Sequence, residues 1–88
     1  MNLHENAMKV RVKLFAAAKQ AAGSDSVEVD VSDRSTVGNL REALSIRFPE
    51  LRTLLRHAMF AINAEYVATE TPLHADQEIA CIPPVSGG

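Results

Sequence analysis

The residues of this sequence best suited to chemistry are its last six, PPVSGG. Pro83 and Pro84 lack amide hydrogens and hold φ at about −65°, so they favour an extended segment that cannot continue a sheet. Gly87 and Gly88 have no Cβ, so they can enter a narrow passage and bring a terminal carboxylate against another protein's backbone. The pattern predicts an arm that delivers its own C-terminus as the reacting group. Gly-Gly also occurs at ordinary chain ends and truncation scars, so the dipeptide alone does not decide.

Cys81 is the only cysteine, so no internal disulfide can form, which fits a reducing, cytoplasmic environment. Alternation in the last predicted strand turns Cys81 inward together with Ile79. A buried thiol behaves as a small hydrophobic group, and no basic residue is expected close enough to lower its pKa. We therefore interpret Cys81 as a core residue rather than a nucleophile.

Metal and nucleotide chemistry lack a recognisable motif in this sequence. No histidine has a second candidate ligand at metal-binding spacing. There is no Gly-rich phosphate loop, no dinucleotide fingerprint and no serine with an evident base partner. We predict no metal site and no bound cofactor in the body of the domain. The histidines are His4, His57 and His74.

Length and composition predict one soluble domain. Eighty-eight residues leave no room for a second hydrophobic core. With 47% hydrophobic and 23% charged residues the chain is expected to fold, and a net charge of −2 gives no reason to expect nucleic acid or an anionic membrane as partner. Residues 1–7 are polar, contain no apolar signal segment and are interpreted as a loose extension.

Two segments with strict alternation predict paired strands that position the arm. Residues 9–15, KVRVKLF, place three apolar side chains on one face and basic side chains on the other. Residues 26–31, SVEVDV, place valines inward and acidic side chains outward. If the two strands pair, a basic row lies beside an acidic one. The alanine-rich stretch between them, ending at Gly23, predicts a short helix with a left-handed terminus.

The second half predicts one main helix and the rest of the sheet. Ser35 or Thr36 can cap a helix whose apolar residues recur at helical spacing until Pro49 ends it. A further helical turn or two is expected within residues 50–57. Strands are predicted at residues 59–62, 66–68 and 78–82. The main helix is expected to pack across a mixed sheet.

Two apolar residues are predicted on the outer face of this sheet. Alternation places Phe15 at the end of the basic row and Ile82 immediately before the arm. If the first strand lies beside the last, the two side chains form an apolar spot at the root of the arm. Such a cluster suggests a docking surface, although the protein's own loops could instead cover both residues.

From about Met8 to Gly88 the chain resembles the small subunits of molybdopterin synthase, which are ubiquitin-like β-grasp sulfur carriers. The stretches that carry the resemblance are LFAAAKQAAG, STVGNLREAL with FPEL after it, AINAEYV and EIACIPPVSGG. One departure is Asp76, which stands where the family usually has glycine in the turn before the last strand. Aspartate tolerates a left-handed conformation, so we expect this turn to be retained.

The resemblance implies an α+β, β-grasp fold with a mixed sheet packed on one main helix. It implies an extension at residues 1–7, a domain at 8–82 and a flexible tail at 83–88. The Gly88 carboxylate would be adenylated, converted to a thiocarboxylate and used to build the dithiolene of molybdopterin. The remaining tail residues would be Pro83, Pro84, Val85, Ser86 and Gly87. The partner-binding residues would be Phe15, Lys19, Tyr66 and Ile82.

The resemblance also implies that this subunit is not catalytic alone. Its expected partners are the large synthase subunit, in a heterotetramer, and an ATP-dependent enzyme that adenylates and sulfurates the tail. ATP and its metal would belong to that enzyme. The alternatives left open are a carrier for thiamine, cysteine or tungsten-cofactor sulfur, a ubiquitin-like modifier joined through Gly88 to target lysines, and a plain β-grasp interaction module.

Overall fold

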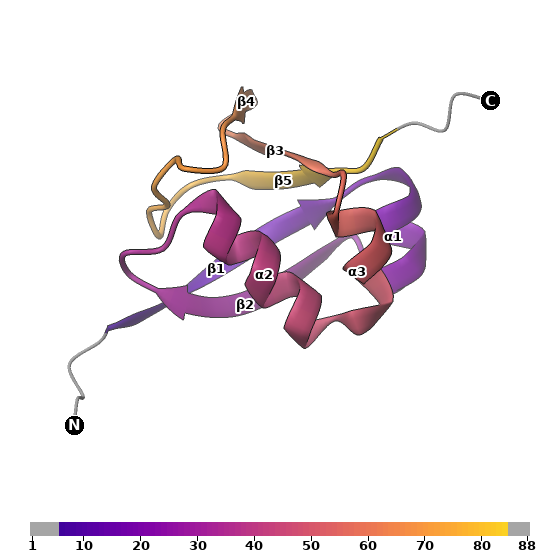
Figure 1. Ribbon diagram of the computed structural model, residues 1–88, viewed down its shortest axis with the longest axis horizontal. Helices are drawn as coiled ribbons and strands as arrows, with labels where there is room; N and C mark the ends of the chain where they lie inside the picture. Colours follow the sequence, from indigo (N-terminus) through magenta and orange to yellow (C-terminus); the bar gives the residue numbers. More distant parts are fainter. Residues whose placement is uncertain (1–5, 85–88) are drawn as a thin grey trace.

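The computed structural model describes residues 6–84, which form a five-stranded mixed sheet with its helices on one face (Figure 1). The strand order is β2-β1-β5-β3-β4, in which β1 and β5 run parallel and the other neighbours run antiparallel. This is the predicted α+β, β-grasp arrangement, and it confirms that the first strand lies beside the last. The strands are β1 (Ala7–Leu14), β2 (Ser26–Ser32), β3 (Met59–Ile62), β4 (Glu65–Val67) and β5 (Ile79–Ile82).

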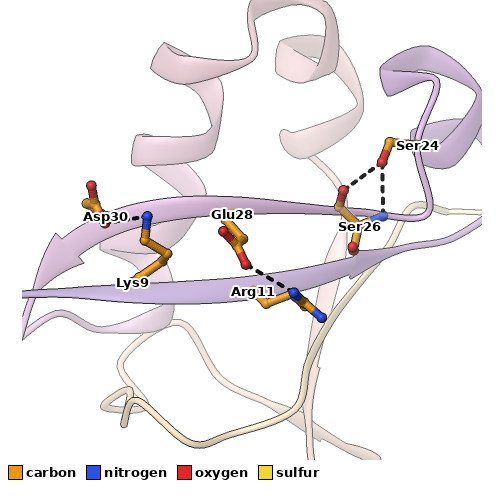
Figure 2. Close-up of polar contacts among 6 residues, drawn as sticks. All are labelled: Lys9, Arg11, Ser24, Ser26, Glu28 and Asp30. Atoms are coloured by element: carbon orange, nitrogen blue, oxygen red, sulfur yellow. Dashed lines mark hydrogen bonds and ion pairs between the residues drawn. The ribbon is translucent and has the colours of Figure 1, made fainter.

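The predicted charge rows of the first two strands face each other. Arg11 Nη2 lies 3.1 Å from Glu28 Oε2, and Lys9 Nζ lies 4.0 Å from Asp30 Oδ1 (Figure 2). Both pairs are exposed, so each adds at most about 1 kcal/mol to stability but favours this register over a shifted one. At the entry to β2 the Ser24 hydroxyl donates to the Ser26 carbonyl at 2.7 Å.

The hydrophobic core lies between the sheet and helix α2 (Val37–Arg47). Leu40 and Leu44, one helical turn apart, are fully buried, so α2 presents the predicted apolar stripe to the strands. The inward residues of β1 and β5 meet this stripe from the other side. The strand residues buried in this way are Val10, Val12, Leu14, Val29, Val31, Phe60, Ile62, Ile79 and Cys81.

The helix boundaries follow the predicted signals. Short helix α1 (Ala16–Ala22) ends at Gly23, whose φ of 69° is left-handed as expected. Of the two candidate caps for α2 the structure uses Thr36, which forms a reciprocal capping box with Asn39. The turn after α2 contains the short helices η1 (Pro49–Leu51) and α3 (Arg52–Leu55).

Several strand boundaries differ from the predictions by one or two residues. Ala7 pairs with Ser32, so β1 includes the last residue assigned to the N-terminal extension. Strand β4 starts at Glu65 because Asn63 and Ala64, both with positive φ, already close the hairpin turn. Strand β5 starts one residue later than predicted, at Ile79, because the Glu78 amide donates to the Asn63 side chain instead.

The turn before β5 is retained, but for a different reason than expected. Asp76 does not have positive φ, so no left-handed residue is needed at that position. The His74 amide instead donates to the Gln77 side-chain oxygen at 2.7 Å, and the Gln77 amide donates to the His74 carbonyl at 3.4 Å. The side chain of Gln77 thus holds the turn together.

Arg41 connects α2, the end of α3 and β3, which sequence analysis did not predict. Its Nη1 donates to the carbonyls of Leu55, the last residue of α3, and Ala58, and its guanidinium lies 5.1 Å from the centre of the Phe60 ring. The side chain therefore satisfies carbonyls that a helix end leaves unpaired. It fixes α3 against α2 and β3.

Candidate functional site

Strand β5 leads directly to the segment predicted to react. Pro83 is buried and Pro84 is exposed, so the folded body extends one residue beyond the predicted boundary at Ile82. Proline at these positions offers no amide for a further strand pair. The other four tail residues, Val85, Ser86, Gly87 and Gly88, lie outside the described residues.

Phe15 is placed at the same end of the sheet by the parallel pairing of β1 and β5. Leu14 is in register with Cys81, so the next residue on each strand, Phe15 and Ile82, reaches the same level of the outer face. Phe15 is still extended, and Ala16 then turns the chain with a φ of 53°. The Phe15 ring remains 44% exposed.

A hollow of about 290 Å³ lies on the outer face beside this point, and we call it the outer-face hollow. It brings together three of the four residues predicted to bind a partner. Its volume is at or below the lower limit for small-molecule sites, so it suits one side chain of another protein better than a cofactor. Its lining residues are Lys13, Phe15, Ala61, Ala64, Tyr66, Glu78, Ala80 and Ile82.

The apolar residues around the hollow are unusually exposed. Tyr66 is 64% exposed on β4, whereas Ile82, predicted to be exposed, is half-buried. Met59, 50% exposed, is the cross-strand neighbour of Ile82 and extends the same surface. Sequence analysis missed Met59, because only the pairing of β3 with β5 places it beside Ile82. We call Phe15, Met59, Tyr66 and Ile82 the docking surface.

Lys19, the fourth predicted partner-binding residue, does not line the outer-face hollow. It lies on α1, and its Nζ is 3.0 Å from Asp25 Oδ1. It does line a neighbouring hollow that Phe15 and Lys13 also border. Because both side chains are exposed, this ion pair is weak, and Lys19 can leave Asp25 to pair with a carboxylate of a partner protein.

Cys81 is buried, in agreement with the prediction, on the face opposite the docking surface. Burial raises the pKa of the Cys81 thiol from 9.0 to about 11, although the nearby Arg41 acts in the lowering direction. A basic residue is therefore near the thiol, contrary to expectation, but desolvation outweighs its attraction. At neutral pH the sulfur is a protonated thiol and a poor nucleophile.

This pKa predicts a loss of stability at high pH. Unfolding returns the thiol to its ordinary pKa, so the unfolded state loses its proton first and is favoured as the pH rises from 9 towards 11. Between pH 8 and pH 10 we expect the free energy of unfolding to fall by about 1 kcal/mol more in the unmodified chain than in Cys81→Ala. Urea denaturation at both pH values measures the difference. Equal pH dependence in the two chains would contradict it.

Other features of the described residues offer no competing centre. Within residues 6–84 no three histidine, cysteine or acidic side chains are grouped to hold a metal ion. No helix in that range is long and apolar enough to cross a membrane. A larger hollow between β2 and α2 is bordered by Lys9, Glu28 and Asp30, whose charges already pair across the strands.

Comparison with known proteins gives a match to the ThiS family model over residues 12–88. The molybdopterin synthase sulfur carrier subunit of Dictyostelium discoideum is 37% identical over 81 residues, which covers 89% of this chain and 94% of that protein.

Two solved structures are also similar to this chain. The crystal structure of SAMP1 from Haloferax volcanii has a TM-score of 0.78 at 36% identity and covers 91% of this chain and 99% of its own. The protein–protein complex of subunits 1 and 2 of the molybdopterin-converting factor from Helicobacter pylori contains a chain with a TM-score of 0.66 at 26% identity. The similarity covers 92% of this chain and 100% of that chain.

Proposed function

Because this chain belongs to the ThiS family, we propose that it is the sulfur carrier subunit of a molybdopterin synthase. The observation that carries the proposal is the similarity to molybdopterin synthase sulfur carrier subunits along nearly the whole chain. The family match extends to Gly88, so the Gly-Gly end is part of it.

The reacting group in this proposal is the C-terminal carboxyl of Gly88. A terminal carboxyl has a pKa of about 3.5, so at neutral pH it is an anion and a poor electrophile. In adenylation one carboxylate oxygen bonds to the α-phosphate of ATP and pyrophosphate leaves, so the carbonyl carbon then carries AMP as a leaving group. Sulfur from a donor then displaces AMP and leaves a thiocarboxylate, whose sulfur is passed to the pterin precursor to build the dithiolene.

The chain works with partners rather than as an enzyme on its own. An ATP-dependent enzyme supplies the adenylation and the sulfur, and the large synthase subunit supplies the site where sulfur is transferred. ATP and its metal bind to the activating enzyme, so this chain requires no cofactor of its own. The reaction takes place in the cytoplasm, which suits a protein with one buried thiol and no disulfide.

The docking surface is the part of the described chain best suited to holding these partners. Phe15 and Ile82 lie where β5 passes into the tail, and Tyr66 borders the same hollow from β4, so a protein bound there is placed to receive the tail. The similarity to a chain of the Helicobacter pylori complex supports a protein partner. We propose that the complete synthase is a heterotetramer of two carriers and two large subunits.

Intact mass spectrometry tests the proposal directly. The chain is incubated with an activating enzyme of the molybdopterin pathway, ATP and a sulfur donor, and a second sample lacks ATP. We expect a mass gain equal to replacement of one oxygen by sulfur, only with ATP. Subsequent addition of the large subunit and the pterin precursor should remove the sulfur and yield molybdopterin. Failure to gain sulfur, or retention of all of it, would contradict the proposal.

A second candidate function is that of a ubiquitin-like protein modifier. The similarity to SAMP1, a small archaeal modifier protein, favours it, because both uses require activation of a Gly-Gly end. The same incubation with added cell protein distinguishes the two. Adducts of the mass of a whole protein would support a modifier. Sulfur passed only to a thiamine, cysteine or tungsten-cofactor enzyme would support a carrier of another pathway.

A further inference from the structure

One row of the outer-face hollow crosses four strands in register. Lys13 of β1 is opposite Ala80 of β5, Ala80 is opposite Ala61 of β3, and Ala61 is opposite Tyr66 of β4. The two adjacent alanines have short side chains, and the longer side chains of the lysine and the tyrosine border them. We call the surface of Ala61 and Ala80 the floor of the hollow. Ala61 is only 6% exposed although it is on the outer face, because taller neighbours surround it.

Lys13 differs from the two other basic residues of β1. Lys9 and Arg11 each pair with an acidic residue of β2, as Figure 2 shows. Lys13 is opposite Ser26 on that side and Ala80 on the other, and it forms no ion pair with any residue in the described part of the chain. Of the three basic residues on the outer face of β1, Lys13 is thus the one without an acidic partner on β2, and it borders the two alanines of the hollow.

We propose that the large synthase subunit inserts one bulky apolar side chain over Ala61 and Ala80, and that a carboxylate next to it pairs with Lys13. The inference rests on the proposed function and adds the chemistry of the partner's contact. The evidence for an acidic group is charge complementarity. Glu78 and Asp25 share hollows with Lys13 but form no ion pair with it, so an inserted side chain that excludes water would leave Lys13 without a counter-charge. The evidence for this partner is continuity, because the floor adjoins Phe15 and Ile82 at the start of the tail.

A charge reversal with a matched control tests the carboxylate. Lys13→Glu and Lys9→Glu make the same change four residues apart on one face of one strand, and both positions are exposed. Binding to the purified large subunit is measured by titration calorimetry at low and at high salt. We expect Lys13→Glu to raise Kd at least about tenfold at low salt and to weaken the salt dependence. Lys9→Glu should stay within about twofold, because its pair with Asp30 is exposed.

A change of floor height tests the inserted side chain. Ala80→Met fills the hollow, whereas Ala80→Ser keeps its volume. We expect the Met variant to raise Kd at least about tenfold and the Ser variant to change it within about twofold. Circular dichroism and the thermal midpoint establish that each variant is folded. If the Met variant does not fold, the Lys13 comparison decides alone.

The outcomes separate this inference from the proposed function. Equal binding by Lys13→Glu and Lys9→Glu, or normal binding by a folded Ala80→Met, overturns the inference while the carrier role stands. An unmodified chain that fails to bind the large subunit at all contradicts the proposed function. A second copy of this chain is the other possible occupant. Analytical sedimentation tests this alternative. A homodimer that is lost in Ala80→Met and that competes with the large subunit would overturn the inference and identify the second copy as the occupant.

Discussion

Deletion of Gly88 is expected to abolish molybdopterin synthesis while leaving the free energy of unfolding nearly unchanged. The deletion leaves the terminal carboxyl on Gly87, about 3.5 Å short of its place in the full chain, so the arm no longer reaches the sites where the carboxyl is activated and used. Stability should persist because Pro83, the last buried residue within residues 6–84, lies five residues before the deletion. The measurement is synthesis by the reconstituted carrier, large subunit and activating enzyme, together with urea denaturation of the carrier alone.

Removal of residues 2–5 is the control truncation. It shortens the chain at the end that the proposed chemistry does not use, and we expect activity to be retained. Substantial synthesis by the Gly88 deletion would show that the reacting atom lies elsewhere. A large fall in its stability would show that the tail belongs to the folded body.

Phe15→Ala is expected to weaken binding to the large subunit at least about thirtyfold, because a partly exposed aromatic side chain at an interface is a typical hot spot. Phe15 precedes α1 and is 44% exposed, so its loss should cost folding far less than loss of a core aromatic residue. The measurement is Kd by titration calorimetry, alongside the thermal midpoint of the free variant.

Ile46→Ala is the matched control for that measurement. Ile46 is also a large exposed hydrophobic residue, 73% exposed, but it is on α2 beside β2 rather than on the docking surface. We expect it to bind normally. Equal loss of affinity in the two variants, or early unfolding of Phe15→Ala with normal binding, would place the interface elsewhere.

Most of the fold follows from periodicity in the sequence. Strict alternation in β1 and β2 fixed which side chains face the core, because a shift by one residue would have buried lysines. Gly23 and Thr36 marked helix ends through their own local chemistry. The role of Arg41 was not predictable, because its acceptors are the carbonyls of Leu55 and Ala58, 14 and 17 residues away. Long-range contacts of that kind have no periodic signal.

The candidate site was predictable only in part, for the same reason. Phe15 and Ile82 stood out because alternation placed apolar residues on a polar face. Lys13 looked like any other member of the basic row, and only the register with Ser26 shows that it has no acidic residue opposite it on β2. Lys19 was identified by family resemblance, which does not reveal its pair with Asp25. Alternation in the sequence predicts which face of the sheet a side chain is on, but its neighbours on that face depend on how the strands pair.

The place of β5 in the sheet has a consequence for biosynthesis. It is made after the other four strands of the described residues, yet it lies between β1 and β3 and is hydrogen-bonded to both. Until it emerges, the nascent chain has two separate pieces of sheet that cannot close, and joining them requires contacts between distant parts of the sequence. Folding of the sheet during translation is therefore held back until the strand that precedes the tail is made.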